Sequence, residues 1–167
     1  EDFSVMRTVS LNGMLTSLAT NYNRRNKDVR LYELGNVYIP KKLPLEELPE
    51  ERMQFTLGMY GAGDFFTLKG VIEEFLESIG MRGHVTYDPK AGKNFLHPGR
   101  QANMFYGDVL IGFLGEVHPA VCDNYNLGTR AYVAVLDMPN VLPFATFDRK
   151  YEGIAKYPAV TRDISMV

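Results

Sequence analysis

The chain has 167 residues, a length that suits one domain or one domain with a fragment of a second. Apolar residues make up 46% and charged residues 23%, which is ordinary for a globular protein and argues against intrinsic disorder. The formal charge of −2 excludes a polybasic nucleic-acid binder whose affinity rests on bulk charge. No unbroken run of apolar residues and glycine exceeds the length of 109–115, which is too short for a membrane helix, and the single cysteine favours a reducing compartment. We therefore expect a soluble intracellular protein built mostly as one domain.

The first part of the chain predicts a helix followed by two strands. Apolar side chains at positions 11, 14, 15, 18, 19 and 22 follow the spacing of one helix face, which predicts a helix over 11–22 with Ser10 as its N-cap. The β-branched and aromatic residues of 29–39 predict a strand with a hairpin or bulge at Gly35-Asn36. Prolines and glutamates in 40–51 indicate a surface loop, and 52–60 predicts a second strand.

The second predicted helix is the clearest element of the sequence. Asp64 is placed to cap its start, apolar side chains from Leu68 to Ile79 keep one face, and Gly80 supplies a left-handed residue past its end. Strands are then predicted over 84–87, 101–106 and 109–117, the last two joined by a type II′ turn. A short helix from Pro119 is expected to end at Leu127-Gly128, before a strand over 131–136.

The order of these elements predicts the fold class. About six strands outnumber two or three helices and do not alternate with them, which favours an α+β fold with a mainly antiparallel sheet. The tail after Asp148 differs from the preceding part of the chain, and we interpret it as a linker that leads into a strand. We therefore expect a main domain over 1–148 and the start of a second unit over 149–167.

Three kinds of catalytic or ligand site can be weighed from the residues. Gly61-Ala62-Gly63 before a helix suggests a phosphate loop, but Asp64 places a negative charge where the phosphate would bind. His97, Glu116 and His118 could form a metal set, although each histidine precedes a proline and is more typical of a strand end. Cys122 lies on a predicted helix, where packing is the better interpretation than nucleophilic catalysis.

A short basic segment follows the first predicted helix. Arg24, Arg25, Lys27 and Arg30 carry a net charge of +3 once Asp28 is subtracted. With tyrosines nearby, the segment could contact RNA phosphates or a partner protein. The spacing alone favours a charged helix end and turn.

Several stretches in order resemble the beta chain of bacterial phenylalanyl-tRNA synthetase and together cover nearly the whole chain. Asn12 stands where that family has proline, and Thr67 also departs from its pattern. The matching stretches are Met6-Arg7-Thr8 before Leu11-Asn12-Gly13-Met14-Leu15, Asn23-Arg24-Arg25-Asn26, Val29-Arg30-Leu31-Tyr32-Glu33-Leu34-Gly35, Asp64-Phe65-Phe66-Thr67-Leu68-Lys69-Gly70, His97-Pro98-Gly99-Arg100-Gln101-Ala102, Ile111-Gly112-Phe113-Leu114-Gly115-Glu116-Val117-His118-Pro119 and the tail 156–165.

This resemblance implies a fold and a role that composition does not show. It implies a class II synthetase-like antiparallel sheet flanked by helices, over 1–148, that has lost its catalytic residues. It also implies that 149–167 begins a ferredoxin-like anticodon-binding domain. The signature residues His97, Arg100, Glu116 and His118 would be structural.

The resemblance further implies partners and cofactors for the whole enzyme. An alpha subunit would join phenylalanine to tRNA with ATP and Mg²⁺, in a cytoplasmic α₂β₂ heterotetramer, while this chain would hold no cofactor, catalytic residue or metal. Class II enzymes clamp ATP with an Arg-x-Glu arginine. Here Arg30 and Glu33 are one residue too far apart, so a strand would place them on opposite faces. We therefore expect a noncatalytic assembly domain, or alternatively an RNA-contacting module that uses the basic segment.

Overall fold

The computed structural model describes residues 5–81, 83–148 and 163–165. Most of the predicted linker and second unit at 149–167 lies outside the described residues. The strands are β1 (Val29–Ile39), β2 (Glu50–Tyr60), β3 (Val85–Asp88), β4 (Leu96–Tyr106), β5 (Val109–Val117) and β6 (Ala131–Asp137). The helices are α1 (Leu11–Asn23), α2 (Phe65–Ser78), α3 (Pro119–Asn124), α4 (Met138–Val141) and the 3-10 turn η1 (Leu142–Phe144).

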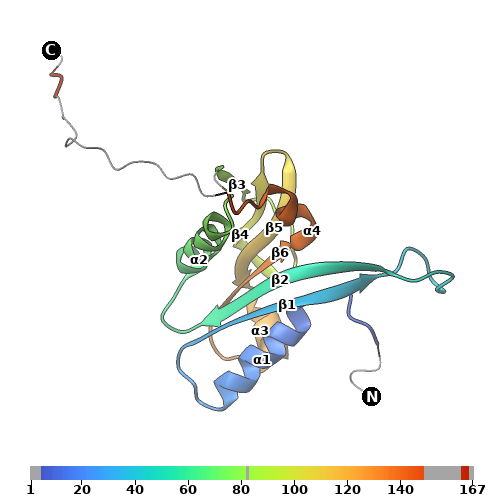
Figure 1. The fold of residues 1–167 in the computed structure, drawn as a ribbon. Coiled ribbons are helices and arrows are strands. Elements are labelled where there is room, and N and C mark those ends of the chain that lie inside the picture. The colour runs from blue at the N-terminus through green and yellow to red at the C-terminus, as the bar shows by residue number, and fades with distance from the viewer. Residues whose placement is uncertain (1–4, 82, 149–162, 166–167) are drawn as a thin grey trace.

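The six strands form one antiparallel sheet in the order β1-β2-β6-β5-β4-β3. Helices α1 and α3 lie on one face of this sheet, and α2 and α4 lie on the other (Figure 1). The α+β class and the antiparallel pairing predicted from the sequence are therefore confirmed. None of the helices in the described part of the chain has the length and apolar content needed to span a bilayer.

Two separate apolar clusters hold the helices on the sheet. Leu15 and Leu18 of α1 pack with Val133 and Val135 of β6 on one face. Residues of α2, including the fully buried Ile72, pack with Leu136 and other strand residues on the opposite face. Since β6 lies between β2 and β5 and is covered on both faces, every residue of 131–136 is buried.

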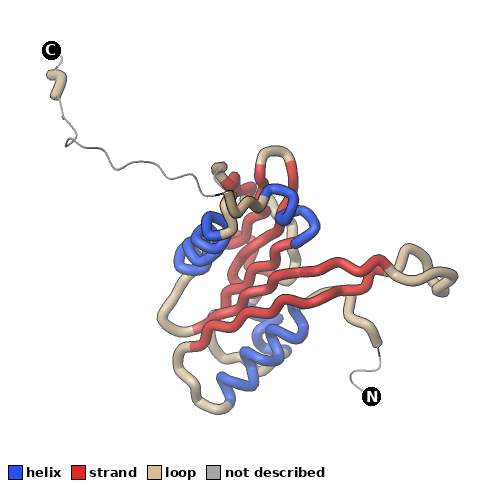
Figure 2. Tube along the Cα trace, in the orientation of Figure 1, coloured by secondary structure: helices blue, strands red, loops and turns tan. Residues whose placement is uncertain are grey.

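The ends of β1 and β2, with the loop 40–49 that joins them, project beyond the helices as an arm (Figure 2). Lys41 pairs with Glu47 at 3.1 Å and Lys42 with Glu46 at 2.8 Å, so the lysines of the loop are neutralised locally. At the base of the arm, the Arg52 guanidinium pairs with Asp137 at the end of β6. The hydrogen bond from Arg52 to Asp137 raises the pKa of the arginine, which keeps this anchor charged.

The predicted hairpin or bulge at Gly35-Asn36 is wrong. Strand β1 pairs with β2 without interruption from Val29, opposite Tyr60, to Ile39, opposite Glu50. The glycine instead makes room for another side chain, since a Cβ at Gly35 would lie 2.3 Å from Arg7 Nη2. Arg7 donates to the Asn36 carbonyl at 2.8 Å and so holds the N-terminal segment against the edge of β1.

Two details at the ends of elements were not predicted from the sequence. Helix α3 ends before Leu127-Gly128 as expected, and the left-handed residue that follows it is Asn126, with φ of 55°. Asparagine tolerates this conformation, while Gly128 leaves room for a neighbouring side chain, since a Cβ there would lie 2.8 Å from the Tyr22 hydroxyl. Helix α4 and the 3-10 turn were not predicted from the sequence because each is shorter than two turns and gives no apolar periodicity.

Asp64 caps α2 as predicted. Its carboxylate accepts the Thr67 N–H at 2.8 Å, and the Thr67 hydroxyl accepts the Asp64 N–H at 3.3 Å in a capping box. The hydrogen bond from the Thr67 backbone lowers the pKa of Asp64. A phosphate loop at Gly61-Ala62-Gly63 is thus disfavoured, because the protein's own carboxylate already occupies the start of the helix.

Replacing Asp64 with alanine is expected to lower the melting temperature near neutral pH by a few degrees. Because the folded-state pKa of Asp64 is lowered, the carboxylate stabilises the fold above its ordinary pKa, and this contribution disappears as the pH falls through the lowered value. The difference between wild type and Asp64→Ala should therefore shrink on acidification, as followed by urea unfolding. Glu74→Gln, an exposed change on the same helix, is the control, and a difference that grows in acid would contradict the capping role.

Candidate functional site

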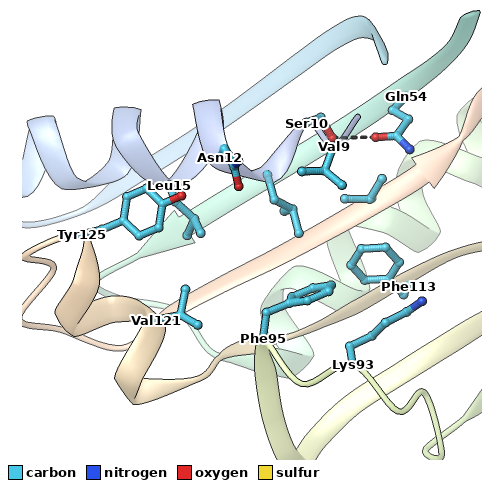
Figure 3. A pocket seen from close by; sticks show the side chains of 12 residues that line it. Val9, Ser10, Asn12, Leu15, Gln54, Lys93, Phe95, Phe113, Val121 and Tyr125 are labelled. Carbon is cyan, nitrogen blue, oxygen red and sulfur yellow. Dashed lines mark hydrogen bonds between the residues drawn. The ribbon is translucent and has the colours of Figure 1, made fainter. Parts of the chain in front are cut away.

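A pocket of about 290 Å³ lies on the α1 side of the sheet, at the point where α1 begins (Figure 3). It is bounded by α1, the strands β2, β5 and β6, α3, and the segment before β4. Sequence reasoning did not single out this pocket, since its walls come from six separate stretches that share no motif. Its lining residues are Val9, Ser10, Leu11, Asn12, Leu15, Gln54, Lys93, Phe95, Phe113, Val121, Tyr125 and Val135.

One end of the pocket carries a chain of hydrogen bonds. The buried Thr56 hydroxyl donates to Ser10 Oγ at 2.6 Å, and Ser10 Oγ donates to Gln54 Oε1 at 2.8 Å. Ser10 stands at the N-cap position of α1 as predicted, but its side chain makes no capping hydrogen bond. The predicted position of the N-cap is therefore right, but the predicted capping hydrogen bond is wrong. The Ser10 hydroxyl links the start of α1 to β2 instead of accepting a backbone N–H of the helix.

Ser10→Ala is expected to destabilise the fold by about 1–3 kcal/mol, because it leaves the fully buried Thr56 hydroxyl without its acceptor. Adding Thr56→Val removes the orphaned hydroxyl. The double variant should consequently be less destabilised than the sum of the two single variants. A double-mutant cycle measured by urea unfolding tests this coupling, and strict additivity would show that the two hydroxyls act independently.

The opposite side of the pocket is aromatic and carries a cation. The rings of Phe95 and Phe113 meet edge to face with centroids 5.7 Å apart. Lys93 Nζ lies 5.1 Å from the centroid of Phe113, in cation–π contact. Lys93 forms no ion pair with a carboxylate of the described residues. The pocket thus joins an apolar wall to an ammonium group that lacks a counterion there.

A buried carboxylate lies at the end of β5, on the face of the sheet opposite the pocket, since Glu116 pairs with Tyr132 of the cluster beneath α2. Glu116 is only 2% exposed, and Arg100 holds it with Nη2 donating to Oε1 at 3.0 Å and Nε 2.5 Å from Oε2. Arg130 Nε approaches the same carboxylate at 4.0 Å. The hydrogen bond with Glu116 raises the pKa of Arg100, so the guanidinium stays charged. This arrangement joins β4 to β5 and gives Glu116 a counterion, while Glu116 Oε2 has no hydrogen-bond partner among the described residues.

The two signature histidines bond to their own backbone neighbours. His97 Nδ1 accepts the Gly99 N–H at 3.1 Å, and His118 Nδ1 accepts the Ala120 N–H at 3.2 Å at the start of α3. Within 5–81, 83–148 and 163–165, the structure brings no three His, Cys, Asp or Glu side chains together as a set that could hold a metal ion. With Glu116 held by Arg100, the geometry disfavours the metal set and favours the strand-end interpretation.

Cys122, the remaining candidate nucleophile, is buried in the cluster beneath α1. Burial raises the pKa of its thiol, so the reactive thiolate is disfavoured near neutral pH. The packing interpretation made from the sequence therefore fits the structure.

The basic segment lies at the turn between α1 and β1. Arg24, Arg25, Lys27 and Arg30 are all exposed, and none forms an ion pair within the described part of the chain. Arg24 is the C-cap residue of α1 and Arg25 follows with φ of 65°, so the segment forms the turn that leaves the helix. The interpretation as a charged helix end fits the geometry, while the cations remain accessible.

An exposed apolar surface lies on the face of β1 and β2 that is turned away from α1, and it was not predicted from the sequence. Tyr32 is 76% exposed, Leu34 56% and Met53 41%. In the β1–β2 register Tyr32 lies opposite Leu57, Leu34 opposite Phe55 and Asn36 opposite Met53, so these side chains share one face of the sheet. We call Tyr32, Leu34 and Met53 the outer apolar surface. The exposed leucines Leu43, Leu45 and Leu48 continue the apolar character onto the arm.

Arg30 and Glu33 do not form an ATP clamp. Glu33 pairs with Arg7 on the α1 side of the sheet, whereas Arg30 is exposed and shares the outer face with Tyr32. The expected separation of the two side chains onto opposite faces is therefore seen in the strand.

The chain is similar in sequence to bacterial tRNA ligases. It is 44% identical over 167 residues to the phenylalanine–tRNA ligase beta subunit of Clostridium acetobutylicum, covering 100% of this chain and 21% of that protein. The corresponding protein of Clostridium tetani is 38% identical over the same length, again with 21% of it covered. The chain thus spans about a fifth of the length of these curated relatives.

Among solved structures, the chain is similar in fold to pyrrolysyl-tRNA synthetases of Desulfitobacterium hafniense. One, titled PylSc, superposes with a TM-score of 0.65 at 13% sequence identity, and another superposes with a TM-score of 0.64 at 14%. Each match covers 81% of this chain and 48% of the other. At this identity the likeness establishes the fold, which is that of a class II aminoacyl-tRNA synthetase.

The family model described as "Phenylalanyl tRNA synthetase beta chain CLM domain" matches residues 1–138. This match covers α1, α2, α3 and all six strands described above. The chain therefore belongs to the family of the phenylalanyl-tRNA synthetase beta chain, as its CLM domain.

Proposed function

We propose that this chain is a noncatalytic domain of a phenylalanine-tRNA ligase beta subunit, and that its role is to assemble the enzyme with the alpha subunit. In this proposal the alpha subunit joins phenylalanine to tRNA with ATP and Mg²⁺, in a cytoplasmic α₂β₂ heterotetramer. This chain contributes shape and contact surface and holds no cofactor. Residues 149–167 lead into an anticodon-binding domain of the complete subunit.

The observation that carries this proposal is the outer apolar surface. Tyr32 and Leu34 lie side by side on the edge strand β1, where α2 covers the neighbouring Phe55 but leaves them exposed. Soluble monomers rarely leave adjoining large apolar side chains uncovered without a partner. Subunit interfaces that form permanently are apolar at their centre and carry aromatic anchors, which Tyr32 supplies.

Glutamates placed on this surface should weaken assembly. In the complete beta subunit, Tyr32→Glu with Leu34→Glu is expected to reduce the affinity for the alpha subunit by at least about tenfold, since each change buries a charge in the interface. Leu110→Glu, at an exposed position on β5 across the sheet, is the matched control and should leave assembly unchanged. Analytical ultracentrifugation measures both, and an unchanged affinity of the double variant would refute this interface.

The noncatalytic part of the proposal has its own test. The purified chain with phenylalanine and ATP should catalyse no pyrophosphate exchange, because Arg30 and Glu33 lie on opposite faces and form no phosphate clamp. The alpha–beta complex measured alongside is the positive control. Exchange catalysed by the chain alone would overturn the proposal.

A second candidate function is contact with tRNA through the basic segment. It is favoured by the exposure of Arg24, Arg25, Lys27 and Arg30 and by the lack of ion pairs to them among the described residues. In contrast, Lys41 and Lys42 on the arm are neutralised by glutamates. Cations without carboxylate partners are the ones that neutralise phosphates and release counterions.

Charge reversal tests whether the arginines of the basic segment contact tRNA or only face solvent at the end of α1. In the assembled enzyme, Arg24→Glu with Arg25→Glu should weaken tRNA binding and make the slope of log affinity against log salt shallower by roughly two. Lys41→Glu with Lys42→Glu is the matched control. Unchanged tRNA affinity and slope for the arginine variant would eliminate the RNA-contact function.

A further inference from the structure

We propose that the pocket beside the start of α1 binds a small organic acid with an aromatic or branched apolar body, and that it discriminates against free amino acids (Figure 3). This inference goes beyond the assembly function and does not depend on it. It rests on the shape of the pocket, the chemistry of its walls and the charge at its rim.

The walls select an apolar body. Leu11 and Leu15 of α1 face Val135 of β6 across the pocket, and Phe95 with Phe113 close another side. Pockets that bind small molecules combine such apolar walls with a few polar groups that fix orientation. A volume of about 290 Å³ lies at the small end of ligand pockets, which suits one ring or a branched chain with a short acid arm.

The charge at the pocket selects the head group. Lys93 is the one charged residue among the twelve that line it, and none of the twelve is an aspartate or a glutamate. Lys93 is half-buried, and its ammonium lies over the Phe113 ring and pairs with no carboxylate of the described residues. A ligand carboxylate would supply this missing counterion in a charge-assisted hydrogen bond.

The charge of the lining also disfavours binding of a free amino acid, which is a zwitterion. The ammonium group of a free amino acid needs a carboxylate partner when it leaves water, and the pocket lining has none. Gln54 Oε1 already accepts the Ser10 hydroxyl, so the polar end of the pocket offers no charged acceptor. An acid that lacks the amino group should consequently bind better than the amino acid of the same shape.

Phenylpropionate is a suitable probe because it differs from phenylalanine only by the missing amino group. Titrated into the 167-residue chain and followed by amide NMR, it is expected to bind saturably with a Kd of about 1 mM or tighter. L-Phenylalanine and neutral phenylpropanol should each bind at least about tenfold more weakly. The shifted amides should belong to residues that line the pocket.

Two substitutions test the assignment on the protein side. Lys93→Met keeps the length of the side chain and should weaken phenylpropionate at least about tenfold, while Lys90→Met, at an exposed position nearby, should leave binding unchanged. Val121→Phe fills the pocket from α3 and should abolish binding. Amide signals far from the pocket report whether each variant is folded.

Four results would overturn the proposal. The first three are the absence of saturation by phenylpropionate, equal affinity for L-phenylalanine, and unchanged affinity in a folded Lys93→Met variant, and the fourth comes from an uncharged probe. N-acetylphenylalaninamide mimics an uncharged side chain of a partner protein. Tighter binding of this amide than of the acid would assign the pocket to a protein side chain and would also refute the acid-binding proposal. None of these four outcomes bears on the outer apolar surface, so the assembly function is tested separately.

Discussion

Replacing Gly80 with alanine is expected to destabilise the fold by about 3 kcal/mol or more and to lower the melting temperature by roughly 10 °C. Gly80 follows α2 with φ of 86°, a left-handed conformation that alanine adopts only at a cost. An added Cβ would lie 1.9 Å from the backbone oxygen of Thr146. That segment cannot move away freely, because the Thr146 N–H donates to the Ile79 carbonyl at 2.9 Å.

Gly70→Ala is the matched control for this prediction. Gly70 lies within α2, and a Cβ added there meets no atom within 4 Å. Alanine is the better helix former by about 0.5–1 kcal/mol, so this variant should be as stable as wild type or more stable. Thermal unfolding followed by circular dichroism compares the two. Equal melting temperatures for Gly80→Ala and wild type would mean that the chain after α4 does not pack on the end of α2.

Leu136→Ala should cost about 3–5 kcal/mol, a large part of the stability of a single domain. Leu136 is fully buried on β6 in the cluster beneath α2. It lies opposite Phe55 of β2 and Gly112 of β5 in the sheet register. Because Gly112 has no side chain that could move into the space left by the leucine, the cavity should persist and the cost should fall toward the upper end of the range.

Leu110→Ala controls for the loss of the same atoms at an exposed position. Leu110 lies near the β4–β5 turn and is 44% exposed, so its truncation should cost less than about 1 kcal/mol. Urea unfolding of both variants gives the comparison. A small loss for Leu136→Ala would imply that the sheet and α2 can close around the missing side chain.

Much of the fold could be predicted because its signals are local. The Asp64 cap, the apolar stripe from Leu68 to Ile79 and the terminal Gly80 specify α2 within seventeen residues, and the structure confirms the helix. The glycine-first turn at Gly107 is also confirmed, with φ of 59° there. Alternating or apolar runs likewise located the strands, with shifts of one to several residues at their ends.

The errors arose where a distant contact overrides the local preference. Ser10 has the residue type of an N-cap, but Thr56 and Gln54, more than forty positions away, hold its hydroxyl. Gly35 has the residue type of a bulge, but it accommodates Arg7, which approaches from the N-terminal segment. Neither partner could be identified before the strands were placed next to one another.

The candidate sites also differ in whether their signal is local in the sequence. The basic segment is continuous in sequence, so its charge could be recognised without a structure. The pocket could not, because Lys93 and Phe113 are brought to the start of α1 only by the order of strands in the sheet. The outer apolar surface was hidden for a further reason: Tyr32 and Leu34 look like ordinary strand residues until α2 is seen to leave them uncovered.

The central position of β6 has a consequence for how the molecule opens. Its amide hydrogens are bonded to β2 on one side and β5 on the other, under helices on both faces. Solvent can reach those amides only when the whole sheet comes apart, so residues 131–136 should be the last in the described chain to exchange hydrogen for deuterium. The free energy of the opening that permits this exchange would equal the free energy of global unfolding. The amides of the arm would report only local fraying.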